Sequence, residues 1–383
     1  MSTYIFFKLS ALYFVYFALL GAMAPYLSLY LESEGFSLLE IGQLVSLLMV
    51  TKMVAPLIWG SLADKYNKSL LLVRVGALMT LVCYLGFFWA HTFWSFAVVI
   101  VLYSFFWNAV LPQIEVLTLY NLAEQKNRYS RIRLWGSIGF IISVALCGWL
   151  FDRQELTVFP WVLLFLISAI VIVSFMGFSE VQLTKTQTKF GKAFKFQLLR
   201  PWVLLFFSAN FLLHLSHGAY YTYFSIYLSS LGYSKVQIGG LWALGVIAEV
   251  MMFVVMHRWL KRSPIENIML LSLLFTVIRW MMTAVYADSF MIIALVQCLH
   301  AFSFGAMHVA SIQFVHHNFE QQSQGRAQAL YSSMGFGAGG AVGAYLSGYM
   351  VSSHSYSNAF LVSAIICSIG FGLVLLMKCR FKN

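Results

Sequence analysis

Nine ionisable side chains interrupt segments of this sequence that are otherwise apolar. They are Lys52, Glu115, Arg133, His214, His217, Glu249, Arg279, His300 and His308. A charged group inside a lipid bilayer is costly, so it usually faces the protein interior, where it pairs with another charge or serves a path for an ion, a proton or a polar solute. Carboxyl and imidazole groups can exchange protons there, and lysine or arginine can bind an anion.

The histidines fall into two groups by helical spacing. His214 and His217 are one turn apart, and Tyr221 follows His217 by four residues, so these three share a helix face. A second face carries Gln297, His300, Phe304 and His308. We expect no metal site, because the sequence has neither a His-Glu-x-x-His pattern nor a Cys and His ligand set. It also lacks a Gly-x-Ser-x-Gly nucleophile motif, which argues against an enzyme.

Membrane-spanning helices are the elements that must position these side chains. Of the 383 residues, 61% are hydrophobic and 10% are charged, whereas soluble domains have about 45–50% apolar and about 25% charged residues. A spanning helix needs about 20 largely apolar residues. Twelve windows qualify, at residues 8–31, 39–60, 69–90, 94–120, 131–151, 160–179, 201–230, 236–257, 266–286, 289–317, 326–351 and 358–378. The sequence therefore predicts an all-α membrane protein with 12 transmembrane helices.

The basic residues indicate how these helices are oriented. The net charge is +11, and most of the 24 lysine and arginine residues fall in segments that face the cytoplasm if the N-terminus does. Of the others, Arg153 and Lys235 fall on the opposite side, and Lys52 and Arg279 lie inside spans. This asymmetry is typical of membrane topology; nucleic-acid binding would need basic residues gathered on one soluble surface. We expect a multi-pass protein of the bacterial inner membrane with both termini in the cytoplasm.

An internal repeat relates the two halves of the sequence. Residues 28–47 and 225–244 are identical at 10 of 20 positions, with a constant offset of 197. Both segments end one span, turn through a Gly-aromatic-Ser sequence and enter the next span, as parallel repeats do. The same offset relates Lys52 to Glu249, so a basic and an acidic side chain are expected at matched depth in the two halves.

A polar segment divides the predicted spans into six and six. We expect an N-terminal six-helix domain over residues 1–179, a cytoplasmic linker over 180–200 and a C-terminal six-helix domain over 201–383. In the eleventh predicted span Gly335, Gly339 and Gly343 recur every fourth residue, which predicts close packing against another helix of the same domain.

Two six-helix bundles around a central path resemble the architecture of the major facilitator superfamily. The loop after the second predicted span adds to this resemblance, because residues 60–68, Gly-Ser-Leu-Ala-Asp-Lys-Tyr-Asn-Lys, are similar to that superfamily's G-x-L-A-D-[RK]-x-G-[RK] signature. The resemblance implies a cytoplasmic gating motif of Gly60, Asp64, Lys65 and Lys68, in which Asp64 pairs with a basic residue or a helix terminus. Asparagine stands at the signature's last glycine, and it tolerates the left-handed backbone conformation.

Further spacings resemble lactose permease-type proton symporters. Glu115 follows a proline by three residues and precedes Arg133 by 18, like the Glu–Arg pair that binds substrate in those transporters. His300, with Arg279 upstream, and Glu249 are similar to ionisable residues in the second half of that permease.

Two departures from that pattern concern Phe140 and Ser303. Phe140 stands where those transporters have a sugar-stacking tryptophan, and Ser303 stands where they have a proton-binding glutamate. A closer resemblance, along nearly the whole chain, is to the phenylpropionate permease family. It is carried by Arg133-Leu-Trp-Gly-Ser137, His217-x-Ala-Tyr220-Tyr221, Leu241-Trp242-x-Leu-Gly245-Val-x-Ala248-Glu249, Ile278-Arg279-Trp280, and Leu299-His300 with His308. It implies proton-linked uptake of aromatic acids such as 3-phenylpropionate.

These resemblances and the residue types together predict roles for the candidate residues. The substrate is expected to contact Lys52, Glu115, Arg133, Phe140, His217, Tyr221, Trp242 and Arg279, whose basic groups would neutralise a carboxylate and whose rings would pack on an aromatic solute. The proton is expected on Glu249, Glu115, His300 or His308, since a carboxyl group away from water holds a proton more readily.

Two other functions remain open from the sequence. The Glu115 to Arg133 spacing favours a sugar or a nucleoside as the transported solute, carried by the same machinery. A membrane sensor or an intramembrane enzyme finds little support, because no long loop or catalytic motif occurs. We expect alternating access by a monomer whose partners are a small solute, protons and membrane lipid, without a cofactor beyond the proton gradient.

Overall fold

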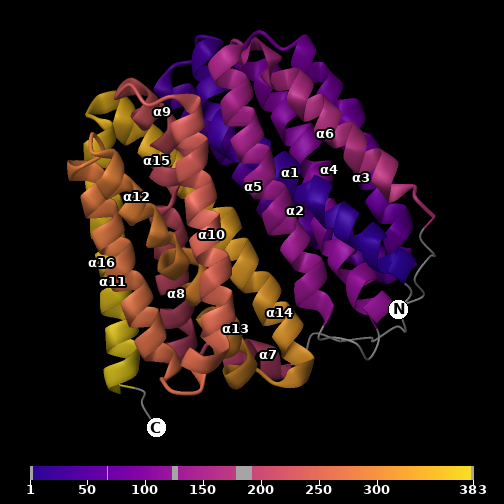
Figure 1. Ribbon diagram of the computed structural model, residues 1–383. Helices are drawn as coiled ribbons and strands as arrows, with labels where there is room; N and C mark the ends of the chain where they lie inside the picture. The colour runs from indigo at the N-terminus through magenta and orange to yellow at the C-terminus, as the bar shows by residue number, and fades with distance from the viewer. Residues whose placement is uncertain (1–2, 67, 123–127, 178–191, 381–383) are drawn as a thin grey trace. The chain divides into compact units, whose positions relative to one another are not determined.

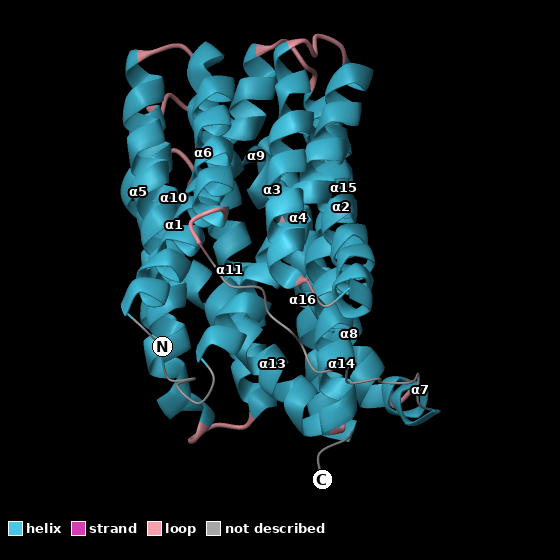
Figure 2. Cartoon of the chain, turned by 90° about the vertical axis from the view of Figure 1, so that its right-hand side faces the viewer, coloured by secondary structure: helices cyan, strands magenta, loops and turns pink. Residues whose placement is uncertain are grey.

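The protein is helical in the described part of the chain, where no strand occurs (Figure 2). The computed structural model describes residues 3–66, 68–122, 128–177 and 192–380. Eleven helices within these ranges are long and apolar enough to cross a membrane. The prediction of an all-α, multi-pass membrane protein is therefore confirmed.

The first half of the chain forms the long helices α1 to α6 (Figure 1). They are α1 (Thr3–Ser33), α2 (Leu38–Tyr66), α3 (Ser69–Leu85), α4 (Phe93–Leu122), α5 (Tyr129–Arg153) and α6 (Phe159–Ser174), with 3₁₀ turns at Gly86–Phe88 and Leu156–Val158. Helix α1 packs against α5 and α6, and α4 packs against α2 and α3. Pro112 lies inside α4, one turn before Glu115; membrane helices tolerate such a proline because nearby groups re-satisfy the freed backbone.

Several spans of the second half consist of shorter consecutive helices. The helices are α7 (Lys192–Leu198), α8 (Pro201–Ser216), α9 (Gly218–Ser230), α10 (Lys235–Leu260), α11 (Ile265–Val285), α12 (Phe290–Cys298), α13 (Met307–Asn318), α14 (Gln321–Ser332), α15 (Gly340–Ser353) and α16 (Tyr356–Arg380). A π-helical turn, η4 (Ala301–Ala306), joins α12 to α13, and another, η5 (Ser333–Gly339), joins α14 to α15. π-helical turns are rare and occur frequently at functional sites.

The eleventh predicted span, at residues 326–351, differs from the others in composition. The end of α14, η5 and most of α15 make this span helical. It is nevertheless not among the eleven segments whose length and apolar composition suit a membrane-spanning helix. Its many glycine and serine residues contribute little apolar surface. Small residues of this kind are typical of membrane helices that pack closely on a neighbour.

The chain divides into two compact units. Unit 1 contains Met1–Lys185 and Tyr233–Ala243, and unit 2 contains Thr186–Gly232 and Leu244–Asn383. The start of α10 thus belongs to unit 1. There the Lys235 backbone N–H donates a hydrogen bond to Oδ1 of Asp152 in α5, at 2.7 Å. Of the linker predicted at 180–200, the part up to residue 191 lies outside the described residues.

Three glycines at intervals of four residues bring η5 and α15 close to α8 within unit 2. A Cβ atom added at Gly335 would lie 2.9 Å from the His214 ring, and one at Gly339 would lie 2.8 Å from a backbone oxygen of α8. A Cβ atom at Gly343 would overlap the Leu215 carbonyl oxygen. The predicted role of these glycines in helix packing is confirmed.

We therefore expect Gly343→Ala to lower the thermal stability of the protein, because the added methyl group meets backbone atoms that cannot move without shifting α8. Overpacking of this kind costs about 1–3 kcal/mol. The measurement is the apparent melting temperature in detergent, and Gly372→Ala in α16 is the matched control, since nothing lies within 4 Å of its added Cβ atom. Equal melting temperatures of the two variants would contradict the close contact.

Candidate functional site

Three ionisable residues of unit 2 form one chain of contacts from Glu249 through His300 to Arg279. Glu249 lies in α10, Arg279 lies in α11, and His300 directly precedes η4. His300 Nε2 is 3.5 Å from Glu249 Oε2, and Arg279 Nη1 is 3.0 Å from His300 Nδ1. The imidazole therefore bridges a carboxyl group and a guanidinium.

The Arg279 guanidinium is enclosed on several sides. Its Nη1 donates to Ser303 Oγ at 2.9 Å, and its Nη2 donates to Gln297 Oε1 at 3.1 Å. The rings of Tyr220 and Trp280 cover it, with centroids 4.3 and 4.6 Å from Cζ. The residue is fully buried, with 0% of its surface exposed. Hydrogen bonds and cation–π contacts thus replace water around this charge.

Two glycines lie beside the contact between Glu249 and His300. A Cβ atom at Gly305 in η4 would lie 3.4 Å from Glu249 Cγ, and one at Gly245 in α10 would lie 3.5 Å from His300 Cβ. These are ordinary van der Waals distances, so an added methyl group would fit at either position and the contact does not depend on glycine there. The π-helical turn begins directly after His300 and contains Ser303, so the irregular helix geometry coincides with the chain of polar contacts.

Gln297 and Ser303 are site residues whose contact with Arg279 the sequence reasoning did not anticipate. The signal was present, because Gln297, His300 and Ser303 recur at intervals of three in an apolar segment and so lie near one helix face. Ser303, which stands in place of the glutamate of the lactose permease-type pattern, accepts a hydrogen bond from Arg279 instead. The cover provided by Trp280 was also not foreseen.

His214 and His217 are engaged by their own helix. Each Nδ1 lies 2.8 Å from the backbone carbonyl oxygen four residues earlier. Because a carbonyl group only accepts hydrogen bonds, both imidazoles are assigned a proton on Nδ1. The His217 ring packs edge-on against Trp280, with centroids 4.9 Å apart, and stacks on Tyr221 at 5.9 Å. His217 and Tyr221 therefore extend the aromatic wall that includes Trp280.

The second histidine face forms a continuous stack of rings. His300 stacks on Phe304 with centroids 5.5 Å apart, and Phe304 stacks on His308 at 5.9 Å. His308 Nδ1 also lies 3.1 Å from the Tyr331 hydroxyl. The predicted common face is confirmed for His300, Phe304 and His308. His300, at one end of this stack, also contacts the Glu249 carboxyl group.

Arg133 of α5 lies against aromatic side chains of α1 in unit 1. Its Cζ is 4.1 Å from the ring centroid of Phe17 and 5.7 Å from that of Tyr13. Glu115 of α4 is close enough to Arg133 to interact electrostatically, although no ion pair within 4.0 Å joins them in the described structure. Phe140 is buried in the same helix as Arg133.

Lys52 of α2 differs from the other basic candidates in its surroundings. It is partly buried, and no acceptor among the described residues lies within hydrogen-bonding or ion-pair distance of its ammonium group. Its repeat equivalent Glu249 contacts His300 in its own unit instead. A lysine inside a span usually has an acceptor nearby, so the surroundings of Lys52 are unusual; its contact with a ligand stays a prediction.

Two further predictions concern α10 and the end of α2. Trp242 is buried and lies in the part of α10 that belongs to unit 1; its contact with substrate stays a prediction. Gly60 has open space around its Cα, and Lys65 and Lys68 are exposed. The Asp64 side chain lies outside the described residues, so the gating latch stays a prediction as well.

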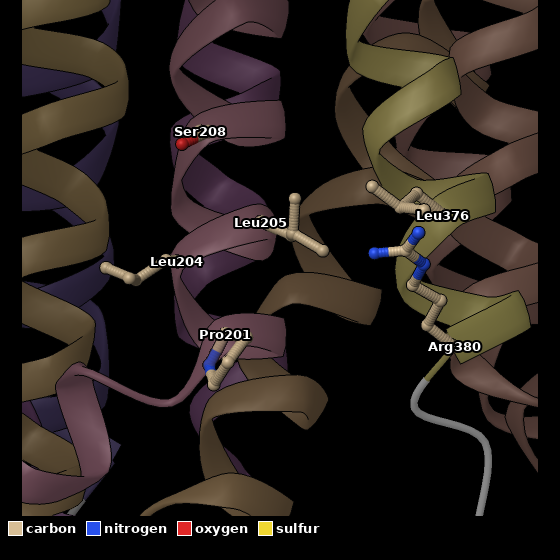
Figure 3. A pocket seen from close by; sticks show the side chains of 6 residues that line it. All are labelled: Pro201, Leu204, Leu205, Ser208, Leu376 and Arg380. Atoms are coloured by element: carbon tan, nitrogen blue, oxygen red, sulfur yellow. The ribbon is translucent and has the colours of Figure 1, made fainter.

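A separate hollow of about 340 Å³ lies between α8 and α16 (Figure 3). Its lining residues are Pro201, Leu204, Leu205, Ser208, Leu376 and Arg380. None of them is a predicted site residue, and most are apolar. The hollow therefore lacks the buried charges that distinguish the chain from Glu249 to Arg279.

Comparison with known proteins places these observations in a family. Residues 6–362 match the family described as the MFS_1 like family. A protein of Escherichia coli (strain K12) named "Probable 3-phenylpropionic acid transporter" is 30% identical over 350 residues, which are 88% of this chain and 89% of that protein. The maltose permease of Geobacillus stearothermophilus is 28% identical over 379 residues, which are 97% of this chain and 94% of that permease.

Solved structures add evidence on the fold. A crystal structure of the nucleoside transporter NupG superimposes with a TM-score of 0.85, and the match covers 99% of this chain and 99% of that one. The sequence identity in this match is 19%, so the likeness shows a shared fold and not a shared substrate.

Proposed function

This chain belongs to the MFS_1 like family, and on that premise we propose that it is a proton-coupled symporter of a small aromatic carboxylate such as 3-phenylpropionate. The relatives are transporters and not enzymes, so the predicted class of protein and its major facilitator fold are confirmed. Our proposal adds alternating access by a monomer in the bacterial inner membrane, with both termini in the cytoplasm and with protons, solute and lipid as its partners.

The observation that supports a carboxylate as the solute is a surplus of one positive charge among the candidate site residues. Glu249 and Arg279 balance each other through the imidazole between them. Glu115 balances one of the two basic residues Lys52 and Arg133. With the histidines neutral, one positive charge is left over, and an unpaired charge away from water is costly. A monoanionic solute would supply the missing negative charge.

The remaining predicted contacts suit an aromatic ring. Phe140 and Trp242 in unit 1 would provide faces and edges for stacking, and so would His217 and Tyr221 in unit 2. Each set favours a ring-bearing solute over an aliphatic one. Lys52 or Arg133 would bind the carboxylate, and arginine can do so with two parallel hydrogen bonds.

We assign the transported proton to Glu249. Its side chain is 16% exposed and contacts His300, and a carboxyl group in surroundings of low dielectric constant takes up a proton readily. Protonation would remove the negative charge that Glu249 presents to His300 and Arg279. The charge balance of unit 2 then differs between the loaded and the empty transporter, which couples the proton to the solute. Glu115, His300 and His308 are the other predicted proton sites.

A competition assay with matched solutes tests the choice of substrate. We expect 3-phenylpropionate to compete in counterflow by the purified protein in proteoliposomes, and we expect 3-phenylpropanol, which has the ring but no charge, to compete at least about tenfold less well. The physical reason is the lost charge-assisted hydrogen bond, worth about 1.5–3 kcal/mol. Equal competition by the acid and the alcohol would contradict the proposal.

A sugar or a nucleoside is the second candidate solute. The specific observation in its favour is that Glu115 precedes Arg133 by 18 residues, the spacing of a sugar-binding pair, together with the relationship to a maltose permease. This alternative predicts that maltose or uridine competes in the same counterflow assay and that 3-phenylpropionate does not.

A further inference from the structure

We propose that Arg279 is a positioning residue that holds His300 as the neutral tautomer with its proton on Nε2, so that Glu249 and not His300 takes up the transported proton. This inference rests on the proposed function, and it assigns to Arg279 a task other than the substrate contact that its charge alone suggests.

Burial excludes Arg279 from direct contact with a solute. Its surface is 0% exposed, and both Nη atoms already donate to His300, Ser303 and Gln297. The Nε atom has no acceptor in the described part of the protein, but it is equally buried. The guanidinium therefore presents no accessible donor to a carboxylate, and its contacts lead to His300.

Hydrogen-bond chemistry then fixes the state of His300. A guanidinium can only donate, so His300 Nδ1, 3.0 Å from Arg279 Nη1, must accept with its lone pair. The single proton of the neutral ring is thereby assigned to Nε2, which lies 3.5 Å from the Glu249 carboxyl group. A second proton on His300 would place two donors face to face and add a positive charge next to Arg279.

The hydrogen-bond acceptors of Arg279 determine how its guanidinium is oriented. Gln297 Oε1 accepts from Arg279 Nη2 and from the Tyr220 hydroxyl, at 3.1 and 3.0 Å. Two donors on one oxygen fix the orientation of the amide, because a flipped amide would turn its NH₂ group toward both. Ser303 accepts on the other side of the guanidinium at 2.9 Å. These hydrogen bonds orient the Arg279 guanidinium so that Nη1 points toward His300 Nδ1.

Glu249 is the group around His300 that can take the proton. The ionisable side chains that interact with His300 or with its contacts are Arg279 from α11, Glu249 from α10, Tyr220 and Tyr221 from α9, His217 between α8 and α9, and His308 from α13. His308 is separated from His300 by the Phe304 ring, and its Nδ1 lies 3.1 Å from the Tyr331 hydroxyl. His217 has its Nδ1 on a backbone carbonyl and packs edge-on against Trp280. The tyrosines and Arg279 already carry their protons near neutral pH. The carboxyl group of Glu249 remains.

Nitrogen NMR on the wild-type protein tests the tautomer without any transport assay. The full chain, labelled with ¹⁵N-histidine and reconstituted in lipid, is measured between about pH 5 and 8, where a free imidazole titrates. The His300 signals are identified as those missing from His300→Asn. We expect an unprotonated Nδ1 and a protonated Nε2 across the whole range. An imidazolium at His300 that grows as the pH falls would overturn the inference, whatever the protein transports.

Arg279→Lys provides the functional arm of the test. Lysine keeps the charge but cannot make the forked contacts to three acceptors at once, so His300 is released. We expect 3-phenylpropionate binding to weaken about tenfold and its pH profile to gain a second titration step between about pH 5 and 8, a step that is absent from Arg279→Lys combined with His300→Asn.

Two outcomes of this arm would overturn the inference. One is a pH profile of Arg279→Lys with the same single step as the wild type. The other is binding that is weaker by the same factor at every pH, since that is the behaviour of a lost substrate ligand. Should the lysine variant fail to fold, Ser303→Ala removes one acceptor of the guanidinium and is expected to give the second step at smaller amplitude. A wild type that moves solute without protons would refute the proposed function but leave the NMR result standing.

Discussion

Glu249→Gln is expected to abolish proton-driven accumulation of the solute while leaving exchange of solute across the membrane intact. The amide has the size of the protonated acid but cannot gain or lose a proton, so it holds unit 2 permanently in the proton-loaded charge state. Coupling of one proton permits about tenfold accumulation per pH unit, since a factor of ten corresponds to about 1.4 kcal/mol. The measurement is uptake into proteoliposomes with an imposed pH gradient, compared with counterflow without one.

The control for this variant uses a carboxyl group elsewhere in the chain. Glu266→Gln lies in the first turn of α11, outside the chain from Glu249 to Arg279, and we expect it to accumulate solute like the wild type. If Glu249→Gln accumulates solute to the wild-type level, Glu249 does not carry the proton. In that event Glu115→Gln is the next variant to measure, because Glu115 is the other carboxyl group among the candidates.

Lys52→Met has the second large expected effect, a loss of affinity for the aromatic carboxylate by about 10- to 100-fold. Methionine has a similar length without the charge, so the spans of unit 1 keep their packing but lose the ammonium group that has no acceptor among the described residues. The measurement is the dissociation constant of 3-phenylpropionate for the purified protein. Affinity for the neutral alcohol analogue should change far less.

Lys261→Met controls for the removal of a lysine as such, because Lys261 is exposed just beyond the end of α10. It is expected to bind the carboxylate with wild-type affinity. Unchanged affinity in Lys52→Met would show that the surplus positive charge does not bind the solute, and it would direct attention to Arg133, whose guanidinium rests on the Phe17 ring.

The fold could be predicted from the sequence to a large extent because the bilayer imposes simple rules. Apolar stretches of spanning length, basic residues between them and the repeat at residues 28–47 and 225–244 specify a helical protein with two halves. The span at 326–351 shows where the hydropathy rule weakens. Its glycines serve contact with α8 rather than with lipid, so packing and not apolar composition explains it.

The ionisable residues of the candidate site stand out in the sequence, but their contacts could not be predicted from it. Burial cost alone identifies Glu249, Arg279 and His300, since few ionisable residues occur in spans. Their sequence separation hides the order of the contacts, because the packing of α10, α11 and α12 decides which side chains meet. Matched depth in the repeat suggested a relation between Lys52 and Glu249, whereas Glu249 contacts a histidine of its own unit.

Arg279 is the clearest example of information that only the packing supplies. From the sequence, a basic residue in a span of a transporter-like chain predicts a ligand for an anion. Rings of Tyr220 and Trp280 cover its guanidinium, and polar groups of the helix that carries His300 occupy its donors. Neither the ring contacts nor the hydrogen bonds could be recognised from a periodic pattern in the sequence, because they arise from residues on different helices.

Proton movement that accompanies the solute tests the central claim most directly. Wild-type proteoliposomes in weakly buffered medium are given 3-phenylpropionate without any imposed gradient, and the external pH is recorded. We predict that the medium becomes more alkaline as the acid enters, that 3-phenylpropanol causes no change, and that Glu249→Gln abolishes the signal. Solute entry by the wild type with no change in external pH would contradict the account.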